Sequence, residues 1–323
     1  MTKLYRKIII YTSCFHVNKP FTSILQGLDY NLGMKTLLLL LVTTLLFAQE
    51  VTLQVLGSGG PELDGRASTS YILWIEHKAK ILIDAGSGSM LRFEESGAKL
   101  EDLELIFLTH MHIDHVVDLP SYIKAGYFSA RQRPLPIIGP KGNHSFPSTN
   151  TFINLQFGEK GAYRYMSDVL TQQSDSFQIL AESLKSEKII NRHFKDFDIS
   201  MISVNHGNIP ALALRIDVGD KSVLISGDSS NANHQLEKLA QDVDLFIAHH
   251  AIAEIEGTYA NQLHMTPSSI AVIAQKSHVK KVVLSHRMRR TLSYEKESLE
   301  IMQQYYKGPI LFADDLSSYK LQD

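Results

Sequence analysis

The chain has 323 residues, of which 44% are hydrophobic and 20% charged, the composition of a globular protein with ample length for a large core. Its formal net charge is −2 at pH 7. Without residues 1–48, which hold five Lys/Arg and one Asp/Glu, 27 basic and 33 acidic residues remain, and the charge becomes −6. Proteins that bind nucleic acids usually carry a basic footprint, which this chain lacks overall, although a local basic patch is compatible with the sum.

The first 48 residues are predicted to be a leader rather than part of the fold. Met34-Lys-Thr precedes an apolar run over residues 37–48, which is the pattern of a secretory signal peptide at residues 34–48. The run is shorter than the ~20 residues of a membrane-spanning helix, and a buried N-terminal helix is the alternative. Residues 1–33 fit neither pattern, so we expect translation to start at Met34. The one cysteine, Cys14, lies in this doubtful extension, so the remaining domain, residues 49–323, has no cysteine and is expected to be a periplasmic or secreted protein.

Alternating strands and helices are predicted along the rest of the chain, with Gly and Pro between them. In the first half, strands are expected at residues 52–56, 70–76, 80–83, 105–108 and 134–140, and helices at 116–131, 163–171 and 177–188. In the second half, strands are expected at residues 199–205, 211–218, 222–226 and 245–248, and helices at 233–241 and 267–276. Two comparable halves of this kind predict two packed sheets with helices outside.

Metal-binding side chains follow directly after one of these strands. Residues 105–108 form a short apolar run, and His110, His112, Asp114 and His115 come within the next seven residues. His110 and His112 are two apart, so on an extended segment their imidazoles project from the same face. Two pairs of nitrogen and oxygen ligands aimed at adjacent points are what a two-metal site requires. A loop that is merely rich in histidine is the alternative, and four ligands within six residues disfavour it.

These residues resemble the markers of the metallo-β-lactamase superfamily, and they occur in the order of that family. The markers, in chain order, are Asp84, the motif His110-x-His112-x-Asp114-His115, His206, Asp228 and His286. The segments around residues 56–61, His264 and His286 are similar to the ribonuclease Z and arylsulfatase-like branch. The resemblance covers about residues 51–323. It implies an α/β fold, the four-layer αββα sandwich called the metallo-β-lactamase fold.

The resemblance also gives each marker a role. It implies that one metal ion is bound by His110, His112 and His206, the other by Asp114, His115 and His286, and that Asp228 bridges the two. Nitrogen and oxygen donors without a thiolate suit two Zn²⁺ ions, with Mn²⁺ or Fe²⁺ as alternatives. We expect Asp84 to orient a metal-binding histidine, because such histidines need a partner on the other ring nitrogen; capping the next turn is the alternative.

The function implied by the resemblance is hydrolysis of a phosphodiester or sulfate ester by a hydroxide held between the two ions. Asp114 would orient or deprotonate this nucleophile, and His264 would protonate the leaving group, unless His264 is only a surface histidine before a helix. We expect a small-molecule ester as substrate and no membrane span, with a homodimer left open. The alternative function is a ribonuclease Z-type endoribonuclease that processes tRNA 3′ ends. The closest sequence resemblance favours it, whereas export, net acidity and the lack of a tRNA-gripping arm at residues 141–195 disfavour it.

Other features stay open at the level of sequence. Arg287, Arg289 and Arg290 beside a metal ligand fit either an anion-binding cluster or the solvated start of a helix. His249 and His250 follow a strand and have no assigned role. β-Lactam hydrolysis fits less well, because the lactamase pattern includes a cysteine. A metal-binding scaffold without catalysis also fits poorly, because every expected ligand is present.

Overall fold

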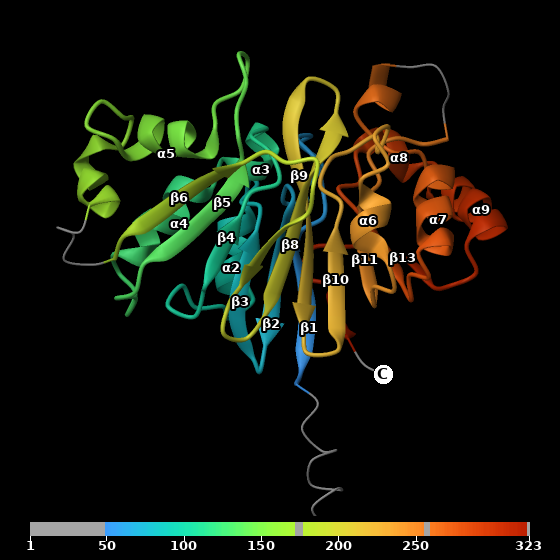
Figure 1. The fold of residues 1–323 in the computed structure, drawn as a ribbon, viewed down its shortest axis with the longest axis horizontal. Helices are drawn as coiled ribbons and strands as arrows, with labels where there is room; N and C mark the ends of the chain where they lie inside the picture. The colour runs from blue at the N-terminus through green and yellow to red at the C-terminus, as the bar shows by residue number, and fades with distance from the viewer. Residues whose placement is uncertain (1–48, 172–176, 255–258, 322–323) are drawn as a thin grey trace, which may run out of the picture. The chain divides into compact units, whose positions relative to one another are not determined.

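Two seven-stranded sheets form the centre of the fold in the computed structural model (Figure 1). The structure describes residues 49–171, 177–254 and 259–321. The predicted leader at residues 1–48 lies outside these ranges and stays a prediction. Within them, no helix has the length and apolar character needed to cross a membrane.

Each sheet mixes parallel and antiparallel strands. The first sheet has the order β14 (Ser318–Leu321), β1 (Val51–Gly57), β2 (Ser70–Ile75), β3 (Lys78–Ile83), β4 (Leu105–Phe107), β5 (Leu135–Pro140), β6 (Ile179–Leu184). The second has the order β13 (Ile310–Phe312), β12 (Val282–Ser285), β11 (Leu245–His249), β10 (Lys221–Ile225), β9 (Ile209–Val218), β8 (Asp198–His206), β7 (Ile190–His193).

The helices lie on the outer faces of the two sheets (Figure 1). In the first half of the chain they are α2 (Ser89–Glu95), α3 (Ile113–Val116), α4 (Leu119–Gly126), α5 (Thr149–Phe157) and the 3₁₀ helix η3 (Arg164–Leu170). In the second half they are α6 (Leu236–Ala240), η4 (Tyr259–Gln262), α7 (Pro267–Lys276), α8 (Arg289–Leu292) and α9 (Glu295–Tyr305).

Alternation along the strands produces three apolar layers. In β1, Val51, Leu53 and Val55 point into the layer between the two sheets, as period-two side chains on one face must. A second cluster joins the outer face of the first sheet to α4 and α5, and a third joins the second sheet to α6, α7 and α9. Helix, sheet, sheet and helix therefore form the four-layer αββα sandwich that the sequence predicts.

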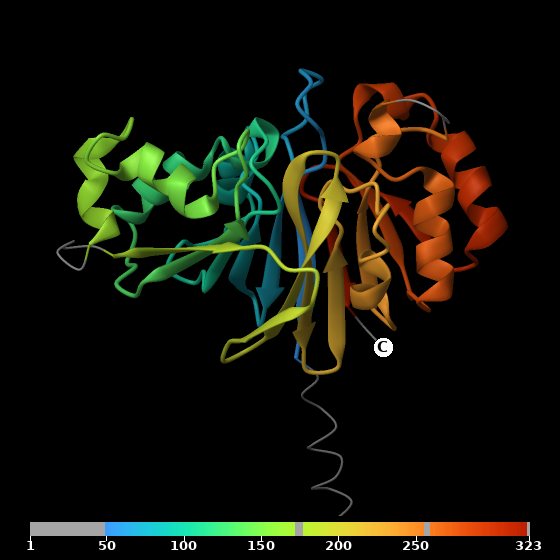
Figure 2. The ribbon, with the colours of Figure 1, turned by 45° about the horizontal axis from the view of Figure 1, so that its top comes forward.

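Parallel pairing brings several strand ends to one edge. Strands β3, β4, β5 and β6 pair in parallel, and so do β10, β11, β12 and β13. Their carboxyl ends lie at the upper edge in Figure 1, which Figure 2 turns toward the viewer. In sheets of this kind the crevice beyond the carboxyl ends is where ligands bind.

Most predicted elements are confirmed, and one is wrong. The strands before the predicted metal ligands and helix α7 lie where the sequence places them, whereas the helix predicted at residues 116–131 is shorter and consists of α4, at residues 119–126, since α3 already ends at Val116. The segment predicted as a helix at residues 177–188 contains strand β6, and all six residues of β6 pair with β5. Its apolar residues fit either period, and the free edge of β5 supplied the backbone hydrogen-bond partners that decide for a strand.

Candidate metal centre

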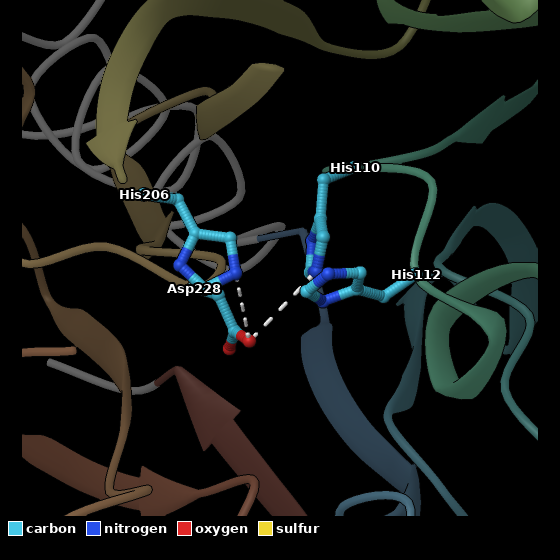
Figure 3. Close-up of side chains that lie close together, drawn as sticks. All are labelled: His110, His112, His206 and Asp228. Carbon is cyan, nitrogen blue, oxygen red and sulfur yellow. Dashed lines mark ion pairs between the residues drawn. The ribbon is translucent and has the colours of Figure 1, made fainter. Parts of the chain in front are cut away.

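Strand ends deliver the predicted metal ligands to one place. His110 and His112 follow β4, His206 ends β8, and Asp228 and His286 follow β10 and β12. Figure 3 shows His110, His112 and His206 arranged around the carboxylate of Asp228. Ligand atoms of these four residues all lie within 4.8 Å of one another. A second group with the same property consists of Asp114, His115 and His286.

Asp228 lies between the two groups. Its Oδ2 atom is 3.8 Å from Nε2 of His110 and 3.6 Å from Nε2 of His206. Its Oδ1 atom is 3.4 Å from Nε2 of His286, and Oδ2 is 3.9 Å from Nε2 of His115. One carboxylate therefore faces imidazoles of both groups, as a bridging ligand must.

The imidazoles have a nitrogen left for a metal. Nε2 of His110, His115 and His206 is buried and has no hydrogen-bond partner, at least within the residues that the structure describes. Buried polar atoms are rarely left unpaired, because the lost hydration costs free energy. Three such atoms aimed at one carboxylate fit a site that binds cations.

The other ring nitrogens are held by the protein. Nδ1 of His115 is 2.7 Å from Asp84, Nδ1 of His206 is 2.7 Å from the Leu263 carbonyl, and Nδ1 of His286 is 2.6 Å from the Thr69 hydroxyl. A hydrogen bond on one ring nitrogen fixes the orientation and the tautomer of the imidazole, so the free nitrogen points into the cluster of candidate ligands.

Asp84 is buried behind the ligands. Besides His115, its carboxylate accepts hydrogen bonds from the backbone N–H of Thr109 at 2.7 Å and from the Thr109 hydroxyl at 2.8 Å. Its backbone is left-handed, with φ of 56°, a conformation that non-glycine residues adopt at a free-energy cost. The same conformation occurs at His286, with φ of 50°. Two strained residues at two strand ends therefore border the same centre.

Gly227 sets the position of Asp228. Its φ is 57°, and a Cβ atom there would lie 3.0 Å from Cβ of Thr109 and 3.1 Å from the Leu212 carbonyl oxygen. Only glycine fits both the backbone conformation and the close approach of β10 to the loop after β4. Gly227, the residue before Asp228, is therefore a packing contact between the two sheets.

His249 is a part of the site that the sequence left without a role. Its Nδ1 atom is 2.7 Å from Oδ1 of Asp228, and its Nε2 atom is 3.0 Å from the Tyr71 hydroxyl. Two hydrogen bonds in series, from Tyr71 to His249 and from His249 to Asp228, thus hold the carboxylate in position. His249 reaches Asp228 because β11 lies beside β10, and this neighbourhood is seen in the sheet order and not in the sequence. His250, in contrast, points away and contacts the Ser298 hydroxyl at 3.0 Å.

The charges of the site are matched around Asp228. Burial alone would raise the pKa of Asp228, but the surrounding imidazoles, His286 and His264 first, hold it well below its ordinary value. Burial also disfavours protonation of His115, yet Asp84 and Asp114 raise its pKa to about 9. The pKa of His110 is held well below its ordinary value, first by burial. Asp228 is thus ionised and His110 neutral, the states in which these side chains bind metals.

His264 belongs to the site rather than to the surface. Its side chain is buried, and its Nδ1 atom is 3.9 Å from Oδ2 of Asp228 without a hydrogen-bond partner in the described part of the chain. Burial lowers its pKa to about 4. The alternative of a surface histidine before a helix is therefore wrong, although Thr266 does cap α7 by accepting from the Ser269 N–H.

The three arginines after His286 lie in different environments. Arg287 is buried and ion-paired with Glu295 and Asp314, so it is neither a free anion receptor nor a solvated helix start. Nε of Arg290 donates to the Ala251 carbonyl at 2.6 Å, and Arg289 is exposed. Arg287 therefore ties the segment after β12 to α9 and the loop after β13.

Similarity to other proteins agrees with this geometry. The family described as "Anti-Pycsar protein Apyc1" matches residues 51–306. The chain belongs to this family. A ribonuclease Z from Listeria welshimeri is 28% identical to this Apyc1-family chain over 265 residues, which cover 71% of the chain and 85% of the relative.

Solved structures show the same fold. The metallo-β-lactamase fold protein YhfI from Bacillus subtilis has a TM-score of 0.65 and 16% identity, covering 84% of this chain and 99% of its own. The short form of human tRNase Z has a TM-score of 0.65 and 20% identity, covering 84% and 100%. The Apyc1-family chain is thus a hydrolase of the metallo-β-lactamase superfamily, in the ribonuclease Z branch that its motifs resemble.

Proposed function

We propose that this chain is a phosphodiesterase that works with two divalent metal ions. The observation that carries the proposal is the position of Asp228, whose two carboxylate oxygens face the imidazoles of two separate ligand groups. His110, His112 and His206 would hold one ion, and Asp114, His115 and His286 the other. Nitrogen and oxygen donors without sulfur suit Zn²⁺ best, with Mn²⁺ and Fe²⁺ as alternatives.

The bound ions would supply a nucleophile at neutral pH and offset the negative charge that develops on the phosphoryl and leaving oxygens. Asp84 would keep His115 in one tautomer, and His249 would keep Asp228 in place. Oδ2 of Asp114 in α3 is 3.7 Å from Nε2 of His115, so its carboxylate would also be close enough to hold the attacking water in line. These residues therefore orient the reacting groups, which is where much of the rate enhancement of such sites comes from.

His264 is proposed to pass a proton to the leaving oxygen. Since burial lowers its pKa to about 4, it is neutral at pH 7 and would carry a proton only in transit. His264 would accept the proton that the attacking water loses and release it to the developing alkoxide. His264 is the histidine of the site that has this property and stands outside both proposed ligand sets.

A phosphodiester is the proposed scissile bond because it is the group cleaved by the ribonuclease Z relatives. Hydrolysis of a sulfate ester, the other half of the sequence-based expectation, has no support from these relatives. Processing of tRNA 3′ ends is a second candidate, because one ribonuclease Z matches the chain over 85% of its length at 28% identity and another over 96% at 22%. Against it stands the −6 charge of residues 49–323.

One panel tests the proposal. The zinc-loaded protein is assayed with bis(p-nitrophenyl) phosphate, a 3′,5′-cyclic nucleotide, p-nitrophenyl sulfate and a precursor tRNA, and Asp114→Ala serves as the inactive control. Turnover of the phosphodiesters but not of the sulfate supports a phosphodiesterase, and cleavage of the tRNA at its 3′ end establishes the second candidate. A protein that hydrolyses none of the phosphodiesters after zinc loading contradicts the proposal.

A further inference from the structure

A cavity of about 300 Å³ lies beside the metal centre, between the ends of β5 and β6 and the β8–β9 hairpin. Two cationic side chains line it, Lys141 and Lys185. We infer that this cavity binds a second phosphate group of the substrate, one that stands next to the scissile phosphodiester. The inference rests on the proposed phosphodiesterase function.

The two lysines come from equivalent points of neighbouring strands. Pro140 of β5 pairs with Leu184 of β6, and the N–H of Lys141 donates to the Leu184 carbonyl at 2.6 Å. Lys141 and Lys185 therefore follow two parallel strands in register, with backbones about 5 Å apart. The carboxyl ends of β3, β4, β5 and β6 in turn carry Asp84, the ligand motif, Lys141 and Lys185. The metal centre and the lysine pair thus share one sheet edge.

The spacing of the strands sets the distance to the metals. From β4 to β6 is two strand intervals, about 10 Å in all. A substrate with its phosphodiester on the metals would therefore extend over the end of β5 and reach the lysines within about one nucleotide unit. A mononucleotide with two phosphates has phosphates at this spacing, and so do two successive nucleotides of an RNA strand.

Two segments of the chain connect the cavity to the metal centre. Asn205 and Gly207, the neighbours of His206, line the cavity. On the other side, the loop after β5 carries Phe146, whose ring centroid is 5.8 Å from that of His112. Asn143 in this loop donates from Nδ2 to the Asn208 carbonyl at 2.7 Å, which joins the loop to the β8–β9 hairpin. A ligand in the cavity would therefore touch Asn205 and Gly207, the two chain neighbours of His206.

The ammonium groups of Lys141 and Lys185 are available to bind an anion. Neither Lys141 nor Lys185 makes an ion pair or a side-chain hydrogen bond within the described residues. The one carboxylate on the cavity wall is that of Glu187, so the lining carries one net positive charge. Two ammonium groups beside a site that binds phosphodiesters favour a phosphate over a neutral group.

Binding of two nucleotides to the metal-loaded protein tests the inference. Adenosine 3′,5′-bisphosphate and adenosine 5′-monophosphate are compared by calorimetry at about 0.1 M salt, with wild type, Lys141→Ala/Lys185→Ala and Lys188→Ala. Lys188 is exposed and does not line the cavity, so it is the matched control. Two exposed ion pairs predict a preference for the bisphosphate of about tenfold in wild type and Lys188→Ala, and about twofold or less in the double variant.

The outcomes separate the inference from the proposed function. A wild type without preference for the bisphosphate overturns the inference, and so does a double variant that keeps the preference. Retained preference in Lys141→Arg/Lys185→Arg would support a charge effect. Turnover of bis(p-nitrophenyl) phosphate, which has no second phosphate, reports the proposed function separately. If the double variant also binds precursor tRNA more weakly with a smaller salt dependence, the second phosphate comes from an RNA strand; unchanged tRNA binding assigns it to a small nucleotide.

Discussion

Replacing Asp84 by asparagine keeps the shape of the side chain behind His115. It removes the negative charge and one of the two acceptor oxygens. The carboxylate accepts from Nδ1 of His115 and from the hydroxyl of Thr109 on Oδ2, and from the N–H of Thr109 on Oδ1. An asparagine has one acceptor oxygen, so in either orientation its amide donor faces a donor of Thr109 or His115. Losing one hydrogen bond to a buried charged group costs about 2–3 kcal/mol of folding free energy.

The larger effect of Asp84→Asn is expected on the metal. Removing the partner of a ligand histidine commonly lowers metal affinity by about 10–100-fold. Because His115 belongs to the group with Asp114 and His286, one of the two ions should be lost first, and phosphodiester turnover should fall with it. Competition with a chromophoric chelator measures the two zinc affinities, and chemical denaturation measures the stability.

Asp118→Asn is the matched control for this change. Asp118 also accepts a backbone hydrogen bond, from Met90 at 3.1 Å, but lies outside the ligand cluster. It should lose some stability and keep both zinc affinities. If Asp84→Asn binds both ions as tightly as wild type, Asp84 does not orient His115 for metal binding.

Three further substitutions have defined outcomes. Gly227→Ala should destabilise the fold by more than Gly219→Ala in thermal unfolding, because both residues have left-handed φ angles, worth about 1–2 kcal/mol each, but only Gly227 also meets Thr109 at 3.0 Å; equal losses would contradict the contact. His249→Phe removes the hydrogen bond to Asp228 and should lower zinc affinity and kcat by about tenfold or more, whereas Tyr71→Phe, one link further away, should have a smaller effect; the reverse order in a chelator competition would argue against these two hydrogen bonds in series. Burial lowers the pKa of His250 to about 4, so on acidification the unfolded chain is protonated at this residue before the folded protein. The contribution of neutral His250 to the free energy of unfolding is therefore complete above about pH 6.5 and is lost toward pH 4. The loss amounts to up to about 3 kcal/mol. Denaturation of His250→Gln against pH should show a shallower loss in that window, and an unchanged slope would refute the assignment.

The candidate metal ligands at residues 110–115 could be predicted from sequence because they follow a strand and stand together in one motif. The apolar run at residues 105–108 and the three histidines after it are adjacent in the chain, so no long-range information is needed to place them together. His206, Asp228 and His286 were found through family order. Their convergence on one edge follows from parallel strand pairing.

The parts that the sequence missed depend on neighbours far along the chain. Strand β6 was predicted as a helix because its pairing with β5 is not visible in its own periodicity. The role of His249 depends on β11 lying beside β10, and burial of His264 depends on its packing close to Asp228. Lys141 and Lys185 are 44 positions apart, and only the register of β5 and β6 brings them together.

The most direct measurement is phosphodiester turnover as a function of zinc bound per chain. Metal-free protein is titrated with zinc, the bound metal is counted by atomic emission, and hydrolysis of bis(p-nitrophenyl) phosphate is followed in the same samples. Two ions per chain are expected, with turnover rising mainly as the second binds, and His286→Ala should stop at one ion with little activity. Full activity with one ion, or unchanged stoichiometry and activity in His286→Ala, would contradict a two-metal centre built around Asp228.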